Sequence, residues 1–264
     1  MHVTRIIHLI ALVALLGAAA GPTIAQDDAT GIVADPCASE KTPEQLPSGQ
    51  WNAYIFARDF GKLCQYRVQN AELMKPGSTP PRVVFMGDSI TEFWGRQHAA
   101  FFTQGKVDRG ISGQTSAQML LRFRQDVIDL HPQAVHIMAG TNDVAGNTGP
   151  STLQQVEGNI ASMAELARAH GIRVILASVP PAGHFPWRPE LQPVPIIGAL
   201  NHWMQDYAAR NGFTYVDYYS ATATPEGAMK PGLASDGVHP TRQGYAVMEP
   251  LAEAAIQQAL GPAP

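Results

Sequence analysis

The chain has little charge, and its basic residues are not concentrated in one region. Only 15% of its 264 residues are Asp, Glu, Lys or Arg, and the formal net charge is −4. Because the basic residues are scattered, the electrostatic basis for binding a phosphate backbone is missing, and nucleic acid is not expected as a partner. With 45% apolar residues the composition is that of a folded protein, which excludes a disordered tail or a repeat array.

Residue spacings typical of metal sites are also missing. The sequence contains neither an H-E-x-x-H nor a C-x-x-C pattern. His136 falls within a strand pattern and His170 at a helix end, so both are interpreted as structural. We therefore expect neither a metal nor a cofactor.

The longest apolar run lies near the N-terminus and is too short to span a bilayer. It extends from Ile6 to Ala20, follows Arg5, and precedes a short segment, ending at Ala25, that is typical of a signal-peptidase cleavage site. A membrane-spanning helix needs roughly 20 such residues. The pattern predicts a signal peptide over residues 1–25, with an uncleaved anchor as the alternative. We expect an exported protein, periplasmic or secreted, with no stable membrane span after cleavage.

Cysteine is scarce: the chain contains only Cys37 and Cys64. In a protein that matures outside the cytosol, these two are expected to form a disulfide, and two separate buried thiols are the alternative. Such a bond would contribute about 3 kcal/mol by the loop-entropy model.

The remaining chain is long enough for one large domain with its own core. Residues 26–81 are interpreted as an N-terminal extension, in which 51–74 carry apolar residues at helical spacing and predict a packing helix. A breaker run, Pro76 to Pro81, ends this extension. Residues 82–264 form the main domain.

Short apolar runs alternate with amphipathic ones in that domain, which predicts a mainly parallel sheet covered by helices. The predicted strands are 82–86, 107–109, 134–138, 173–178 and 213–216, and the predicted helices are 116–130, 152–170, 196–211 and 242–260. The fold class is therefore α/β, a three-layer α/β/α sandwich with a five-stranded sheet of flavodoxin-like order. Reactive groups in such folds collect at the carboxyl ends of the strands.

Three clusters of polar residues directly follow predicted strands. Ser89 comes after the first strand, where a helix starting near Ile90 would place N–H groups beside it, although an N-cap role is the alternative. Gly113 follows the second strand, and its N–H could point into a site or only serve a turn. Asn142 follows the third, and its amide could donate to an oxyanion or form an Asx-turn.

A fourth cluster lies between the last strand and the last helix. Asp236 and His239 are three residues apart on a turn that contains Gly237. The carboxylate can reach the imidazole Nδ1 and leave Nε2 free for a serine. A loop hydrogen bond without a catalytic role is the alternative.

These four blocks together resemble the SGNH hydrolases, also called the GDSL esterase and lipase family. The resemblance rests on Gly87-Asp88-Ser89, on Gly113, on the run from Gly140 to Asp143, and on Asp236 with His239, and it extends from about Val83 to the last helix. The sequence departs from the family name at one position, where Ile90 stands in place of Leu.

The resemblance implies a serine hydrolase that acts on carboxylic esters. It implies Ser89 as nucleophile, His239 as general base and Asp236 as the residue that orients it. It further implies an oxyanion hole formed by the N–H groups of Ser89 and Gly113 and the side chain of Asn142.

The substrate is expected to contact the Pro-rich segment 180–195, which follows the fourth strand. Trp187 within it is a candidate substrate-binding residue, and the alternative is that its ring only anchors the loop. Since no large apolar lid is visible, we expect short-chain esters, including O-acetyl groups on carbohydrate. The alternatives are a lysophospholipase or thioesterase of the same family, and a carbohydrate-binding protein with this fold and no turnover. The sequence contains no indication of the oligomeric state.

Overall fold

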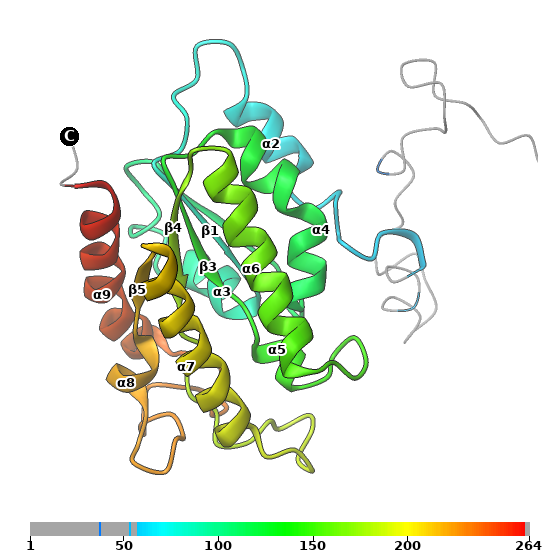
Figure 1. The fold of residues 1–264 in the computed structure, drawn as a ribbon, viewed down its shortest axis with the longest axis vertical. Helices are drawn as coiled ribbons and strands as arrows, with labels where there is room; N and C mark the ends of the chain where they lie inside the picture. Colours follow the sequence, from blue (N-terminus) through cyan, green and yellow to red (C-terminus); the bar gives the residue numbers. More distant parts are fainter. Residues whose placement is uncertain (1–36, 38–52, 54–56, 262–264) are drawn as a thin grey trace, which may run out of the picture. The chain divides into compact units, whose positions relative to one another are not determined.

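The computed structural model describes residues 37, 53 and 57–261, so the predicted signal peptide lies outside the described residues. The chain divides into two units, Met1–Pro47 and Ser48–Pro264, and all helices and strands described below belong to the second (Figure 1). No described helix is both long and apolar enough to cross a membrane.

A five-stranded parallel sheet forms the centre of the second unit. Its strands are β1 (Val83–Gly87), β2 (Lys106–Gly110), β3 (Ala134–Met138), β4 (Arg173–Ala177) and β5 (Thr214–Val216). Their order in the sheet is β2-β1-β3-β4-β5, and every neighbouring pair is parallel. This confirms the predicted flavodoxin-like order, in which the carboxyl ends of the strands share one edge.

The central strands are buried on both faces. All residues of β1 and β3 are buried, with alternate residues belonging to different clusters. Val84 and Met86 pack into one apolar cluster, whereas Val83 and Phe85 pack into the other. Because both faces of the sheet are covered, β1 is a continuous apolar run in the sequence, β3 is interrupted only by His136, and neither strand shows an alternation of apolar and polar residues.

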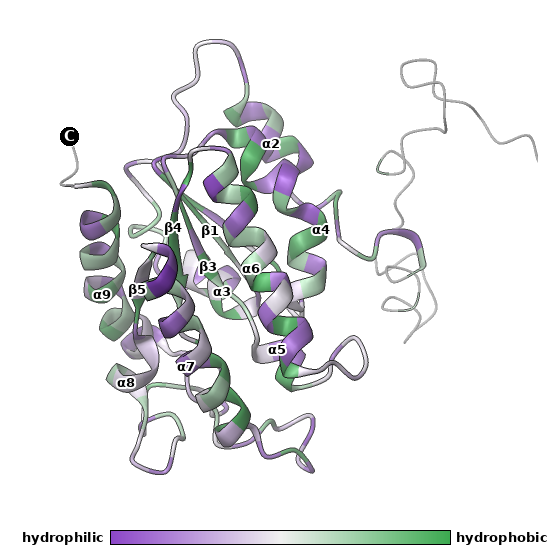
Figure 2. Cartoon of the chain, viewed as in Figure 1, coloured by the Kyte–Doolittle hydropathy of each residue, from purple (hydrophilic) through white to green (hydrophobic). Residues whose placement is uncertain are grey.

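Helices cover the two faces of the sheet and complete the three layers. Those described are α2 (Arg67–Leu73), α3 (Ser89–Gln97), α4 (Ser116–Asp126), α5 (Thr141–Val144), α6 (Leu153–Ala169), α7 (Pro193–Asn211), α8 (Tyr218–Thr222) and α9 (Arg242–Leu260), with a short 3₁₀ helix, η2 (Ile128–Leu130). Helices α4, α6 and α7 share one apolar cluster with the sheet, and α3 and α9 share the other. These helices carry both hydrophobic and hydrophilic residues, as expected when one side packs on a sheet (Figures 1 and 2).

The predicted helix over residues 51–74 is wrong in its middle part. Between residues 59 and 74, only α2 is a regular helix, and residues 59–66 form turns with a positive φ of 51° at Lys62. The Asp59 carboxylate accepts from the N–H groups of Leu63 and Cys64, at 2.8 and 3.0 Å, in place of helical carbonyls. Val68, one of the apolar residues of this segment, is 68% exposed and does not pack into the core.

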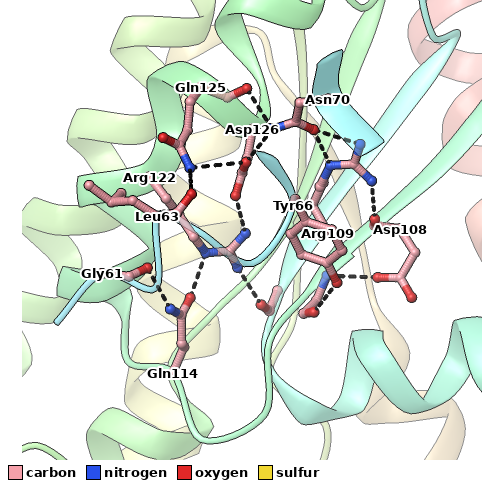
Figure 3. A network of polar contacts seen from close by, with 12 residues as sticks. Gly61, Leu63, Tyr66, Asn70, Asp108, Arg109, Gln114, Arg122, Gln125 and Asp126 are labelled. Atoms are coloured by element: carbon pink, nitrogen blue, oxygen red, sulfur yellow. Dashed lines mark hydrogen bonds and ion pairs between the residues drawn. The ribbon is translucent and has the colours of Figure 1, made fainter. Parts of the chain in front are cut away.

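The turns at 59–66 are held by glutamine side chains from the main domain. Gln114, Gln118 and Gln125 donate to the backbone carbonyl oxygens of Gly61, Phe60 and Leu63, at 2.9, 2.7 and 2.7 Å respectively. Two of these contacts, from Gln114 and Gln125, are drawn in Figure 3. The segment is thus fixed by polar contacts to the start and face of α4, which apolar periodicity cannot reveal.

Candidate active site

Ser89 lies at the carboxyl end of β1, as the first residue of α3. Asp88 precedes it as the N-cap, and its Oδ1 accepts from the Ile90 N–H at 2.9 Å. The cap is therefore Asp88, and the Ser89 hydroxyl is available for other contacts. Because Ser89 is the first helical residue, its N–H has no acceptor within the helix.

The turn from β1 into α3 depends on Gly87. A Cβ at this position would lie 2.0 Å from Oγ1 of Thr91, in the first turn of the helix. The strand end and the helix start therefore approach more closely than any other residue type allows.

The structure brings Ser89, His239 and Asp236 together, although the serine is 150 residues from the histidine. The Ser89 Oγ lies 2.9 Å from His239 Nε2, and His239 Nδ1 lies 2.8 Å from Asp236 Oδ2. With Nδ1–H donating to the carboxylate, Nε2 is free to accept the serine proton. Ser89 is 7% exposed, and the histidine side chain is 20% exposed.

Asp236 is held as an anion by its own loop. Its Oδ1 accepts from the N–H groups of Val238 and His239, at 3.0 and 2.8 Å. Partial burial alone would raise the pKa of Asp236, but the hydrogen bonds from His239 and Val238 lower it below its ordinary value. The carboxylate therefore stays charged beside the imidazole.

Gly113 lies in the loop after β2, with a left-handed φ of 79°. A Cβ at this position would meet no atom within 4 Å, so the loop is open on that side. The loop is held in place through Ser112, the residue before Gly113. The Ser112 N–H donates to Oε2 of Glu92 in α3 at 2.7 Å, and the Ser112 hydroxyl donates to the same oxygen. The loop carrying Gly113 is thus tied to the helix that begins with Ser89.

Asn142 is the second residue of the short helix α5 and is buried. Its Nδ2 donates to Asp88 Oδ2 at 3.1 Å and to the Gln114 carbonyl oxygen at 3.0 Å, and its Oδ1 accepts from Asn147 Nδ2 at 2.6 Å. The amide therefore joins the loops that follow β1, β2 and β3. An Asx-turn, the alternative considered above, is not among these contacts.

Asp88 has a buried carboxyl group that contacts this amide. Burial raises the pKa of Asp88 from 3.8 to about 6, although the Ile90 N–H and the nearby His239 act in the opposite direction. The carboxylate form is the stronger acceptor for the Asn142 amide.

Two aromatic rings flank His239. Phe93 of α3 lies 5.3 Å from the imidazole, and Trp187 lies 6.0 Å from it, measured between ring centroids. Trp187 is 40% exposed, and the centroid of its ring also lies 5.3 Å from that of the buried Phe185. The segment after β4 therefore reaches the site, as expected from its topology.

The buried side chain of Arg122 makes hydrogen bonds to two of the segments that carry site residues. Arg122 of α4 donates to the Gly87 carbonyl oxygen at 3.0 Å, to Gln114 Oε1 at 2.5 Å, and to Asp126 Oδ2 at 3.0 Å (Figure 3). Both side chains of the Arg122–Asp126 pair are fully buried. The network continues through Asn70 of α2, which donates to Asp126 at 2.6 Å. One guanidinium thus connects the end of β1 with the loop after β2.

His136 lies in the core of the sheet. His136 is fully buried in β3, stacks on Phe85 at 4.5 Å, and lies 2.9 Å from the Tyr218 hydroxyl. Burial lowers the pKa of His136 to about 3, so the ring is neutral. Among the described residues, no group of three or more His, Cys, Asp or Glu side chains is arranged to hold a metal ion.

Residues 85–247 match the model of the GDSL-like Lipase/Acylhydrolase family, and this match includes all four loops of the site. The chain belongs to that family. Its members are hydrolases of ester bonds, and the family resemblance inferred from the sequence is confirmed.

Solved structures support the assignment over most of the described chain. A GDSL-like lipase from Bacteroides thetaiotaomicron is 50% identical, with a TM-score of 0.73, over 76% of this chain and 100% of that one. A proposed acylhydrolase from Bacteroides fragilis is 48% identical, with a TM-score of 0.73, over 76% of this chain and 98% of that one.

Curated relatives match over shorter stretches. Esterase TesA of Pseudomonas aeruginosa is 31% identical over 134 residues, which are 51% of this chain and 60% of that protein. The chain spans between about a third and 60% of the length of the curated relatives that it matches.

Sequence reasoning missed three residues that shape this site. Arg122 lies on an amphipathic helix, where a charged residue is ordinarily assigned to the solvent-exposed side. Phe93 and Asn147 follow the family blocks by four or five residues and carry no local signal of their own. All three became evident only from contacts across the fold.

Proposed function

We propose that this family member is a serine esterase in which Ser89 is the nucleophile, His239 the general base and Asp236 the residue that orients it. The observation that carries the proposal is the continuous hydrogen-bonded line from Ser89 Oγ to Nε2 and from Nδ1 to Oδ2, with distances of 2.9 and 2.8 Å. These are the separations that proton transfer requires.

The reaction proceeds in two steps. Ser89 Oγ attacks the ester carbonyl carbon while His239 Nε2 takes the hydroxyl proton, and the imidazolium then gives that proton to the departing alcohol. Water next attacks the acyl-serine with His239 again acting as base, and the carboxylic acid is released with the serine regenerated. Asp236 remains ionised throughout and stabilises the imidazolium.

The oxyanion is received by the N–H groups of Ser89 and Gly113 and by Nδ2 of Asn142. This amide now donates to the neutral carbonyl oxygen of Gln114 at 3.0 Å. An oxygen that carries negative charge is the stronger acceptor and competes for that hydrogen. Loss of one such donor slows acyl transfer by about 10²- to 10³-fold in related chemistry.

For the substrate, we propose short-chain esters, including O-acetyl groups on carbohydrate. The exposed Trp187 ring beside His239 supports this, because a flat aromatic surface suits a sugar ring or a small acyl group. Hydrolysis rates of p-nitrophenyl esters from acetyl to palmitoyl test the acyl part. A maximum at long chains would favour the lysophospholipase or thioesterase alternative.

The Ser89→Ala variant tests the proposal as a whole. We expect kcat for p-nitrophenyl acetate to fall by on the order of 10⁶-fold with the thermal unfolding midpoint unchanged. A fluorophosphonate probe should label the wild type and not this variant. Full activity in Ser89→Ala would refute the assignment, and an unlabelled wild type would favour a binding protein without turnover.

Export is part of the proposal. It is supported by the signal-like segment 1–25 and by the pair of cysteines, Cys37 and Cys64, for which we propose a disulfide, since such bonds persist outside the reducing cytosol. Mass spectrometry of the protein recovered from the periplasm or medium should find Gln26 at the N-terminus. An intact first residue in the cell-associated protein would favour the anchor.

A further inference from the structure

Asn147 has no role in the family motifs, yet its backbone and side chain both contact Asn142. The chain reverses after α5 at Gly146, which has a left-handed φ of 67°. Its return brings the Asn147 N–H to 3.0 Å from the Asn142 carbonyl oxygen, and Asn147 Nδ2 to 2.6 Å from Asn142 Oδ1. Two hydrogen bonds between the same pair of residues restrict both the backbone and the side chain of Asn142.

The side-chain bond determines which way round the Asn142 amide lies. Its oxygen accepts from Asn147, so its nitrogen faces Asp88 Oδ2 and the Gln114 carbonyl oxygen, at 3.1 and 3.0 Å. A flipped amide would place two acceptors against each other at Asp88 and two donors against each other at Asn147. Only the unflipped orientation offers an N–H to a substrate oxyanion.

The other end of the Asn147 side chain contacts the aromatic wall. Its Oδ1 accepts from the Trp187 indole N–H at 3.2 Å, and Trp187 lies 6.0 Å from the His239 ring. The amide of Asn147 therefore joins the ring beside the general base to the donor that receives the oxyanion.

We propose that Asn147 is a positioning residue that fixes the orientation of the Asn142 amide and couples it to the Trp187 side of the substrate site. The inference rests on the proposed esterase function and deepens it. Asn147 acts through Asn142, so its contribution falls on kcat and disappears when Asn142 is removed. The contact with Trp187 instead affects how the substrate is held.

A double-mutant cycle tests this dependence. Asn147→Ala should lower kcat for p-nitrophenyl acetate by about tenfold, less than the loss of the donor itself, and change KM by less than about threefold. In an Asn142→Ala background, the same substitution should change kcat by less than about twofold, because the amide that it orients is gone.

Two further variants separate the halves of the Asn147 side chain. Asn147→Asp keeps an acceptor for the indole but loses the donor to Asn142, so its kcat should fall at least as far as that of Asn147→Ala. Trp187→Phe keeps an aromatic ring but loses the indole N–H, so it should change KM by about as much as Asn147→Ala does, with a smaller effect on kcat. The control is Asn211→Ala, since Asn211 also makes local hydrogen bonds but belongs to α7 and contacts Tyr207 and Arg168.

The outcomes are distinguishable. If Asn147→Ala lowers kcat equally in the wild type and in Asn142→Ala, or changes only KM, Asn147 does not act through Asn142 and the inference is overturned. If Asn147→Ala matches Asn211→Ala while Ser89→Ala is inactive, the inference fails and the esterase proposal stands. If Ser89→Ala remains active, the esterase proposal itself fails.

Discussion

Removal of Arg122 should cost far more stability than removal of any exposed arginine. In Arg122→Met, the Asp126 carboxylate remains fully buried without its cation, which costs about 3–5 kcal/mol in comparable pairs. Gln114 Oε1 also loses its donor, whereas the Gly87 carbonyl oxygen still accepts from Ile111 N–H at 3.1 Å. We expect a loss of at least about 4 kcal/mol from a total of roughly 5–15 kcal/mol.

The assay is urea-induced unfolding followed by circular dichroism, with Arg124→Met as the matched control. Arg124 lies on the same helix, 62% exposed, and its nearest approach to Asp129 is 3.7 Å. Such a surface pair contributes about 0–1 kcal/mol. A second variant, Arg122→Met with Asp126→Leu, should be more stable than Arg122→Met alone, because no isolated charge remains buried. Equal losses in Arg122→Met and Arg124→Met would refute the reasoning.

Three further predictions concern a buried acid, a helix contact and the proposed triad. Burial raises the pKa of Asp108 from 3.8 to about 7, so its carboxyl stabilises the fold fully below pH 3.8 and loses that contribution as the pH rises to about 7. Asp108→Asn should therefore gain stability relative to the wild type across that range, by at most about 4 kcal/mol. Gly244→Ala should lower the free energy of unfolding by about 1–3 kcal/mol, since its Cβ would lie 2.2 Å from the Leu233 carbonyl oxygen. Asp236→Asn should lower kcat by about 10⁴-fold without affecting the unfolding midpoint, because His239 loses the carboxylate that sets its tautomer.

Matched controls accompany these variants. Asp206→Asn removes a carboxylate that is 51% exposed and should show no stability gain that grows between pH 4 and 7. Gly158→Ala in α6 introduces a Cβ with nothing within 4 Å and should stabilise by about 0.4–1 kcal/mol. A pH-independent effect of Asp108→Asn, or equal effects of Gly158→Ala and Gly244→Ala, would contradict the packing described. For Asp236→Asn, a kcat within tenfold of the wild type would contradict the proposed role of Asp236 in the triad.

The sheet could be predicted because its strands are covered on both faces. Every residue of β3 is buried, so the strand is apolar except for His136, and its predicted bounds, Ala134–Met138, are confirmed. The predicted last helix is likewise confirmed as Arg242–Leu260, since Thr241 caps it and the apolar period continues for five turns. Long elements with one clear burial pattern leave little ambiguity.

Short or polar elements could not be predicted. Helix α8, Tyr218–Thr222, is too short to show a period, and it depends on Asp217 accepting from the Ser220 N–H at 2.9 Å. Residues 59–66 carry apolar residues at helical spacing but are held by glutamines more than fifty positions away. In both cases the deciding interaction is a hydrogen bond, which a hydropathy pattern does not record.

Some residues of the site could likewise be predicted from the sequence and others could not. Asp236 and His239 could be paired from the sequence because three residues separate them on a turn. Ser89 and Asn142 could be placed near each other because each follows a strand of a parallel sheet. Asn147 and Arg122 could not be placed from the sequence. The role of Asn147 depends on the left-handed turn at Gly146, and that of Arg122 depends on the burial of a charged side chain.

The loop from Asp236 to His239 has a consequence for how the site tolerates motion. The Asp236 carboxylate accepts hydrogen bonds from both the backbone N–H and the ring of His239. We therefore expect the two side chains to keep their relative position when the loop moves. A small displacement of that loop would leave the His239 tautomer unchanged and alter the distance between His239 Nε2 and Ser89 Oγ. Activity lost by such a displacement should return when the distance between His239 Nε2 and Ser89 Oγ is restored, because the hydrogen bond between Asp236 and His239 was never broken.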